Sequence, residues 1–368
     1  MNKQFQIPHT TIKVVGLGGG GSNTIARMIE FGVEGVDFVA ANTDVQALKS
    51  NPASRKVLLG PQVTGGQGAG GRPEVGRKAA EESRDALAAA LYGADMVFLT
   101  AGMGGGTGTG AIAVAAEVAR AQGAVTVSVV TTPFGFEGRK RYENAIAGLR
   151  QLQKHTDTLV VVPNERLLAI APQNLPLTAA FRLADEVLRR AIQGITDIVT
   201  QVGLINRDFN DVRRMMASGG GALIAMGTGK GENRVADAIR AALHNPLIGD
   251  VSLDSATGVL ANFVGGDDLA LYEIVAGMQA LHDSLPENAD VVWGYNTDPN
   301  FEGRAQVVLL ITGVGGVPVA TARGEKQRAL SPASASSPAS PTRPSIDANL
   351  ENAELPAFLR RRLRSATA

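Results

Sequence analysis

The sequence predicts an α/β fold: a Rossmann-like parallel sheet, a long central helix, a smaller α+β C-terminal domain and a disordered tail. Three observations lead to this prediction. Apolar runs typical of buried strands alternate with helical patterns over residues 11–176. A long helical segment with few breakers, 177–202, follows them, and strands and helices alternate again over 203–314. Residues 315–349 include a stretch dominated by Ser, Ala and Pro, which is typical of a disordered linker.

The composition of the chain argues against several classes of function. With 368 residues the chain is long enough for two domains, between a flexible extension at 1–10 and a terminal peptide at 350–368. The net charge of +0 and the 4% of aromatic residues argue against nucleic acid as a partner. We find no signal peptide and no apolar run of membrane-spanning length, so we expect a cytoplasmic protein without direct membrane insertion. The sequence has no cysteine and its four histidines are scattered, so we expect no metal site built from protein side chains.

The first strand, predicted over 11–17, runs into a glycine-rich stretch that ends before a helix starting at Thr24. Gly16, Gly18 and Gly21 satisfy the G-x-G-x-x-G pattern of dinucleotide-binding proteins. A second strand over 36–41 leads into Asn42, Thr43 and Asp44. An NAD-dependent oxidoreductase is therefore one alternative.

Two further glycine-rich loops favour a different ligand. The strand predicted over 55–59 precedes a loop over 60–72, and a proline then opens a single long helix predicted over 73–91. The strand predicted over 96–100 precedes a loop over 102–110, followed by a helix over 111–121. Glycine N–H groups, threonine hydroxyls and helix N-termini all donate to anions. Three such loops on one sheet edge would surround a polyphosphate, whereas a dehydrogenase needs only one.

The next strands, over 125–131 and 158–162, complete the first domain, and the second of them ends close to Asn164. Between them, Glu137 and Arg141 share a helix face. They could pair with each other, or hold a ribose and a base. On the long helix, Phe181 and Asp185 also share a face; they could stack on guanine and accept its N–H groups, or be a core ring and a solvated acid.

The chemistry of hydrolysis needs a group that polarises water, and the glycine loops supply none. The closest polar cluster is Asn206, Asp208 and Asp211, at the start of the second domain. These residues could cap a helix, or they could activate water. Because the long helix separates them from the phosphate loops, they could act only on a neighbouring molecule's nucleotide, as in head-to-tail filaments.

The last residues regain a helical pattern. Leu355, Phe358, Leu359 and Leu363 share one face, with acidic residues before them and arginines after them. We expect a short recognition helix that folds on a partner protein; a basic solvated tail is the alternative.

These motifs together resemble one family. Residues 104–110 read GGGTGTG, the signature of the tubulin/FtsZ family, and the likeness extends over about 11–314 and 350–362. FtsZ is the bacterial tubulin-like cell-division GTPase. The resemblance implies GTP or GDP as the ligand, Mg²⁺ held by phosphates and water, and filaments of the division ring at midcell. It implies that residues 354–362, from Glu354 to Arg362, bind membrane-anchoring proteins of the FtsA type and regulatory division proteins.

The resemblance also assigns roles to residues. Gly19, Gly20, Gly106, Thr107 and Gly108 would contact phosphates, Glu137 and Arg141 the ribose, and Asn23, Phe181 and Asp185 the guanine. The acids Asp208 and Asp211, supported by Asn206, would complete a neighbour's site. The remaining implied nucleotide contacts are Gly21, Asn42, Gly70, Gly71, Gly104, Gly105, Thr109 and Asn164. Arg72 departs from the family, which usually has Asn or Asp there, and places a positive charge near the loop for the terminal phosphate.

Overall fold

A computed structural model describes residues 10–169, 174–200, 209–217, 220–248 and 251–314. Asn206, Asp208, the predicted linker and the predicted terminal peptide lie outside the described residues.

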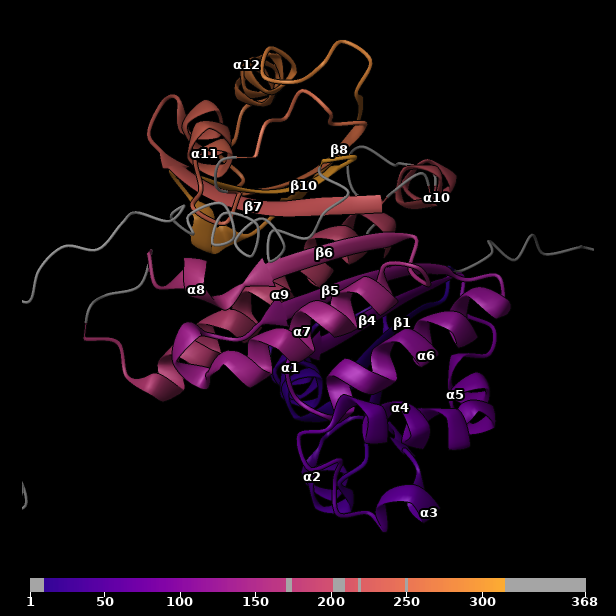
Figure 1. The fold of residues 1–368 in the computed structure, drawn as a ribbon. Coiled ribbons are helices and arrows are strands. Elements are labelled where there is room, and N and C mark those ends of the chain that lie inside the picture. The colour runs from indigo at the N-terminus through magenta and orange to yellow at the C-terminus, as the bar shows by residue number, and fades with distance from the viewer. Residues whose placement is uncertain (1–9, 170–173, 201–208, 218–219, 249–250, 315–368) are drawn as a thin grey trace, which may run out of the picture. The chain divides into compact units, whose positions relative to one another are not determined.

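Ten strands form a single sheet in the order β3-β2-β1-β4-β5-β6-β7-β10-β8-β9 (Figure 1). The first six are all parallel, which confirms the predicted Rossmann-like half. They are β1 (Ile12–Leu17), β2 (Asp37–Asn42), β3 (Arg55–Leu58), β4 (Met96–Gly102), β5 (Val125–Thr132) and β6 (Thr158–Pro163). Every residue of β1 and β5 is buried, as expected for parallel strands covered on both faces.

The C-terminal half continues the same sheet with mixed pairing, as an α+β domain should. Its strands are β7 (Gly220–Lys230), β8 (Gly258–Gly265), β9 (Asp290–Thr297) and β10 (Arg304–Thr312). Strand β10 runs antiparallel between β7 and β8, and β8 pairs in parallel with β9. Within the sheet, the described residues of the two halves join through three parallel residue pairs, Thr158 to Val160 of β6 opposite Gly220 to Ala222 of β7.

Helices cover both faces of the N-terminal half (Figure 1). On one face, α1 (Gly18–Glu30) and α9 (Leu177–Thr200) share a core with the sheet. On the other face lie α4 (Pro73–Glu82), α5 (Arg84–Leu91), α6 (Thr107–Ala121) and α7 (Arg139–Leu152). A third core joins the C-terminal strands to α11 (Arg234–Leu243) and α12 (Leu271–His282).

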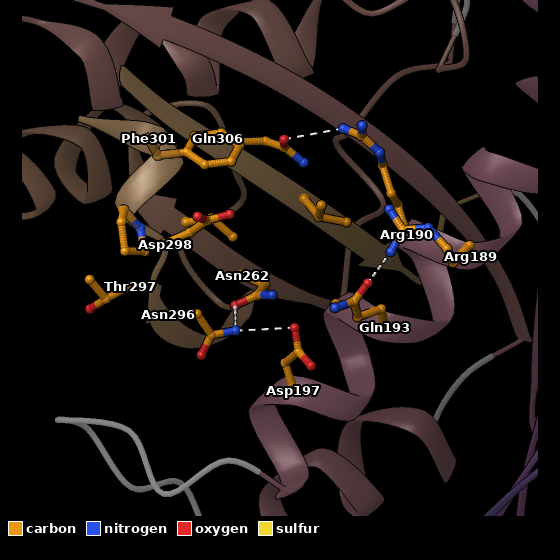
Figure 2. Close-up of a pocket in the computed structure, with 14 residues that line it drawn as sticks. Arg189, Arg190, Gln193, Asp197, Asn262, Asn296, Thr297, Asp298, Phe301 and Gln306 are labelled. Atoms are coloured by element: carbon orange, nitrogen blue, oxygen red, sulfur yellow. Dashed lines mark hydrogen bonds between the residues drawn. The ribbon is translucent and has the colours of Figure 1, made fainter. Parts of the chain in front are cut away.

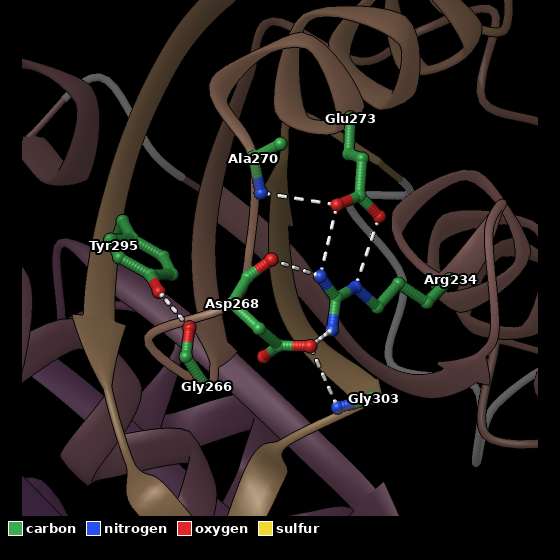
Figure 3. Close-up of polar contacts among 7 residues, drawn as sticks. All are labelled: Arg234, Gly266, Asp268, Ala270, Glu273, Tyr295 and Gly303. Atoms are coloured by element: carbon green, nitrogen blue, oxygen red, sulfur yellow. Dashed lines mark hydrogen bonds and ion pairs between the residues drawn. The ribbon is translucent and has the colours of Figure 1, made fainter.

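A buried arginine ties the C-terminal helices together (Figure 3). The guanidinium of Arg234, on α11, donates to both carboxylate oxygens of Glu273 on α12, at 3.0 and 2.9 Å. It also donates to the carboxylate of Asp268, at 2.6 Å. Glu273 in turn accepts from the amide of Ala270, at 3.1 Å, which caps the start of α12. The ion pair holds the pKa of Glu273 below its usual range.

Three helix predictions are wrong in instructive ways. The single helix expected over 73–91 is broken at Ser83, whose hydroxyl accepts from the amide of Gly60 and donates to the carbonyl of Leu58. Helix α1 begins at Gly18 and not at Thr24, and α6 begins at Thr107 and not at residue 111. Glycine is a poor helix former, so its propensity argued for loops at both places. The sequence did not predict the short helices α2 (Val45–Ser50), α3 (Pro61–Thr64) and α8 (Asn164–Leu167).

Candidate nucleotide site

The first turns of α1 and α6 meet at the carboxyl edge of the sheet, with almost no side chain between them. A Cβ on Gly20 would lie 3.0 Å from the amide nitrogen of Gly102, and one on Gly18 would lie 2.7 Å from that of Gly108. A Cβ on Gly21 would meet the carbonyl oxygen of Thr100 at 2.3 Å. Close backbone approach therefore explains why the first turns of both helices are rich in glycine. The first four N–H groups of a helix have no partner within it, so two sets of free donors converge here.

Open space borders this pair of helix starts. Beside Gly19 and Gly105, no atom lies within 4 Å of the position where a Cβ would stand. Gly19 and Gly20 are exposed in the first turn of α1. Of the expected phosphate contacts, Gly19 and Gly20 are thus accessible and Thr107 is half-buried, whereas Gly106 and Gly108 are buried, as is Gly21.

Side chains hold the neighbouring loops against the starts of α1 and α6, which together we call the phosphate cradle. The hydroxyls of Thr43 and Thr107 are 2.6 Å apart, which links the end of β2 to the start of α6. The Thr109 hydroxyl accepts from the amide of Gly104, at 2.7 Å. The amide of Asn144, on α7, donates to the carbonyl of Gly104 at 3.3 Å and to that of Gly71 at 3.4 Å. These contacts hold Gly104 at a φ of 106°, where a Cβ would be strained.

Two buried asparagines follow the strands that flank the cradle. Asn42 ends β2, and its side-chain oxygen accepts from the amide of Asp44 at 3.3 Å. Asn164 follows β6 and is buried, yet its side-chain oxygen has no hydrogen-bond partner among the residues that the structure describes. A buried acceptor without a partner is costly, so Asn164 is suited to a ligand hydroxyl. Gly70 and Gly71 are exposed, with positive φ, in the loop before α4.

On the side of β5 and β6, an ion pair and three rings border the site. Glu137 accepts from the amide of Phe134 at 2.9 Å and pairs with Arg141, which is the pairing alternative. Phe134 is buried, stacks on Phe136 at 5.1 Å and meets the edge of Phe181 at 5.4 Å. Phe181 itself is 40% exposed, so its outer face can receive a planar base.

Asp185 lies one turn beyond Phe181, with its side chain 14% exposed. Its carboxylate accepts from the hydroxyl of Thr24 at 3.2 Å and forms an ion pair with Arg27 at 3.3 Å. Burial raises the pKa of Asp185 to about 6, and the charge of Arg27 and the hydrogen bond from Thr24 limit that rise. Asn23 is exposed in the same first turns of α1. A carboxylate beside an exposed ring can accept the paired N–H groups of guanine.

Asp211 lies near the edge of the sheet where the parallel strands begin, opposite to the carboxyl edge that carries the phosphate cradle. It stands in the first turn of α10 (Phe209–Ala217), where its carboxylate pairs with Arg214 at 3.1 Å. The other end of α10 is fixed to the first residue of β6, because the Thr158 hydroxyl donates to the carbonyl of Met216 at 2.6 Å. Asn164 follows the last residue of that same strand. The structure therefore does not bring Asp211 to the phosphate cradle of its own molecule.

Comparison with known proteins identifies the family to which the chain belongs. The sequence model of the Tubulin/FtsZ family, GTPase domain, matches residues 11–172, and that of the FtsZ family, C-terminal domain, matches 220–315. Cell division protein FtsZ 1 of Archaeoglobus fulgidus is 45% identical over 305 residues, which are 83% of this chain and 82% of that protein. The chain belongs to the FtsZ family.

Solved structures agree with this assignment. An empty FtsZ dimer from M. jannaschii is 47% identical, with a TM-score of 0.80 over 84% of this chain and 89% of that one. A GTPγS-bound CetZ2 protofilament from Haloferax volcanii shares the fold at 21% identity, with a TM-score of 0.71 over 87% of this chain and 98% of that one. This FtsZ-family chain is thus a GTPase that binds guanine nucleotide, and the family assignment favours the triphosphate over the dinucleotide interpretation.

The donor groups of the cradle suit an anion and not a cation. No group of three or more His, Cys, Asp or Glu side chains that could hold a metal ion occurs in the described part of the chain. Within the same residues, no helix has the length and apolar character needed to cross a membrane.

This FtsZ-family chain also has a cavity between α9 and the strands of the C-terminal half (Figure 2). It has a volume of about 410 Å³ and is lined by Arg189, Asp197, Asn262 and Asn296 among others. Asn296 donates to the carboxylate of Asp197 at 3.1 Å. Burial raises the pKa of Asp197 to about 6, and Arg189 and the two asparagines offset part of that rise. Helix α9 therefore carries two carboxyl groups that titrate near neutral pH.

Sequence reasoning missed the residues that connect these parts. Arg27, Thr43 and Asn144 each contact a group far away in the chain: Asp185, Thr107, and Gly71 with Gly104. No local spacing indicates such contacts. The sequence offered two signals: Thr43 directly follows a strand, and Asn144 lies inside a helix next to the glycine loops.

Proposed function

We propose that this FtsZ-family GTPase hydrolyses GTP only within a filament, where the acidic segment at the start of one molecule's second domain completes the nucleotide site of the next. The observation that carries the proposal is the placement of Asp211. It stands on α10, whose Met216 is bonded to the first residue of β6, at the other end of that strand from Asn164, so the acid lies away from the phosphate cradle of its own molecule. A head-to-tail contact between copies would bring them together.

In this proposal the free N–H groups at the starts of α1 and α6, with the exposed Gly70 and Gly71, hold the phosphates. Asn164, Glu137 and Arg141 face the ribose, while Asn23, Phe181 and Asp185 hold the guanine. Asp211 and Asp208 of the neighbouring copy polarise a water that attacks the terminal phosphorus, giving GDP and phosphate, and Asn206 supports them. Mg²⁺ would be bound by phosphate oxygens and water.

Exposed apolar side chains support contacts between copies. Phe136, Leu177 and Phe181 are 61%, 58% and 40% exposed beside the proposed guanine site. On α12, Leu271, Tyr272 and Val275 are each more than 60% exposed. Groups of exposed large apolar residues mark protein contact sites. The dimer of the M. jannaschii relative and the protofilament of CetZ2 are assemblies of the same fold.

The cellular role follows from the family. We propose that the filaments form the cytoplasmic division ring at midcell. The segment from Glu354 to Arg362, beyond the described residues, would recruit membrane-anchoring proteins of the FtsA type and regulatory division proteins.

A complementation assay tests the shared site. Asp211→Ala retains its own nucleotide site, while Asp185→Ala retains its acids but should bind GTP poorly. Each variant alone should hydrolyse GTP slowly, and an equimolar mixture should exceed the sum of the two, because one copy supplies nucleotide and the other supplies acids. Asp237→Ala is the matched control, since Asp237 pairs with Arg240 at the same three-residue spacing as Asp211 with Arg214. A mixture no faster than the sum, or turnover per molecule that is constant upon dilution, would contradict the proposal.

A further inference from the structure

Arg72 is a cation without a counter-charge at the edge of the phosphate cradle. Its side chain is exposed and forms no hydrogen bond or ion pair with any residue that the structure describes. The arginines after β5 differ, because Arg139 pairs with Glu143 at 2.6 Å and Arg141 pairs with Glu137. Arg72 is therefore available to an anionic ligand.

The backbone of Arg72 is fixed against the cradle. Its amide donates to the carbonyl of Ala69 at 3.1 Å, and its carbonyl accepts from Val75 and Gly76 as α4 begins. Its amide nitrogen also lies 2.8 Å from where a Cβ on Gly106 would stand. The start of α4 is thus pressed onto the loop that leads into α6, so Arg72 has little freedom to leave this position.

The side chain of Arg72 turns back over the glycines of its own loop. Its Nε lies 4.0 Å from the position of a Cβ on Gly70. The carbonyl of the next residue, Gly71, is held together with that of Gly104 by the amide of Asn144. The guanidinium group therefore lies along the loop of Gly70 and Gly71, which faces the start of α6.

We propose that Arg72 contacts the terminal phosphate of GTP and makes the site discriminate the triphosphate from GDP. This inference rests on the proposed nucleotide site. The glycine loops and helix starts offer partial positive charge, whereas Arg72 offers a full charge and two parallel N–H groups that match phosphate oxygens. GDP lacks the phosphate that would make this contact, so Arg72 should affect GDP binding little.

The test compares binding of GDP and of a GTP analogue that cannot be hydrolysed, by the full chain below its assembly concentration. In Arg72→Asn, the ratio of analogue affinity to GDP affinity should fall about tenfold, the effect of losing one charge-assisted contact. For Arg72→Lys this ratio should lie between that of the unsubstituted chain and that of Arg72→Asn, because lysine keeps the positive charge but lacks the two parallel N–H groups of arginine. Arg77→Asn is the control, since Arg77 is exposed on the same helix and pairs with Glu81. Added salt should weaken analogue binding more in the unsubstituted chain than in Arg72→Asn.

The outcomes separate this inference from the proposed function. Unchanged GDP affinity in Arg72→Asn, with a reduced ratio, supports the contact and shows that the variant is folded. An unchanged ratio, or an equal loss in Arg77→Asn, would overturn the role of Arg72 and leave the nucleotide site standing. Failure of the unsubstituted chain to bind either nucleotide at the cradle would overturn both.

Discussion

Replacing Arg27 by glutamine should make guanine nucleotide binding sensitive to pH near neutrality. Arg27 provides the one charged interaction that lowers the pKa of Asp185, against the burial that raises it to about 6. Thr24 donates a hydrogen bond from the same helix. The neighbouring charges of α9 are engaged elsewhere: Glu186 binds Arg189 and Arg190.

The magnitude follows from the titration. With a pKa of about 6, Asp185 is half ionised at pH 6 and about nine-tenths ionised at pH 7. An opposite charge at this distance lowers a carboxyl pKa by about one to three pH units, and the partial exposure of Arg27 favours the lower end. Arg27→Gln should then reduce the ionised fraction at pH 6 from about one half to about one tenth. Because guanine N–H groups need the carboxylate as acceptor, GDP affinity should fall about fivefold at pH 6.

The assay is GDP binding by calorimetry from pH 5.5 to 8.5, which avoids hydrolysis. Binding should weaken as the pH falls through the pKa of Asp185, and that midpoint should be about one pH unit higher in Arg27→Gln. At pH 8.5 the variant should bind no more weakly than the unsubstituted chain. Arg182→Gln removes an exposed charge from α9, one turn before Asp185, and should leave the profile unchanged. A midpoint that stays in place or moves down in Arg27→Gln would refute the reasoning.

Three further predictions concern stability and access. Asp197→Asn should raise the Tm much more at pH 7.5 than at pH 4: burial raises the pKa of Asp197 from 3.8 to about 6 in the folded state, so native Asp197 becomes destabilising as the pH rises through that interval. Calorimetry checks this, and an equal gain at both pH values would contradict it. Glu273→Gln should reduce the free energy of unfolding by about 3 kcal/mol in urea titrations, because it leaves the buried Arg234 without its main counter-charge. In the unsubstituted chain this contribution should be lost as the pH falls through the lowered pKa of Glu273. Gly19→Ala should leave the Tm unchanged, since open space surrounds that position. It should weaken GDP binding by about tenfold or more, because the added methyl group would block the approach of a phosphate to the backbone N–H groups. Undiminished GDP affinity would count against the cradle.

Hydrophobic runs were sufficient to predict the parallel sheet, and the glycine-rich loops pointed to the edge where we propose that the nucleotide binds. Strands such as β1 and β4 are continuous apolar runs because helices cover them on both faces. Glycine loops after three strands then had to meet at one edge, because parallel strands end on the same side.

Helix starts and long-range contacts could not be predicted in the same way. Local propensity disfavours glycine in helices, but at Gly20 and Gly21 the close approach of β4 outweighs it. The pair of Arg27 and Asp185 joins residues that only the packing of α1 on α9 brings together. Ser83 looks like an ordinary helical residue until β3 and the following loop supply partners for its hydroxyl.

The junction of β6 and β7 bears on how a filament of this chain would carry tension. In the described part of the sheet, three residue pairs, from Thr158 to Val160, join its two halves. If copies stack from the phosphate edge of one to the Asp211 edge of the next, the pulling direction runs along β6. A load parallel to a strand stretches all the hydrogen bonds of its ladder together, whereas a load across the strand breaks them one after another. A short ladder loaded in shear is stiff for its size, so with α9 alongside it this narrow junction can transmit force along the filament without peeling apart.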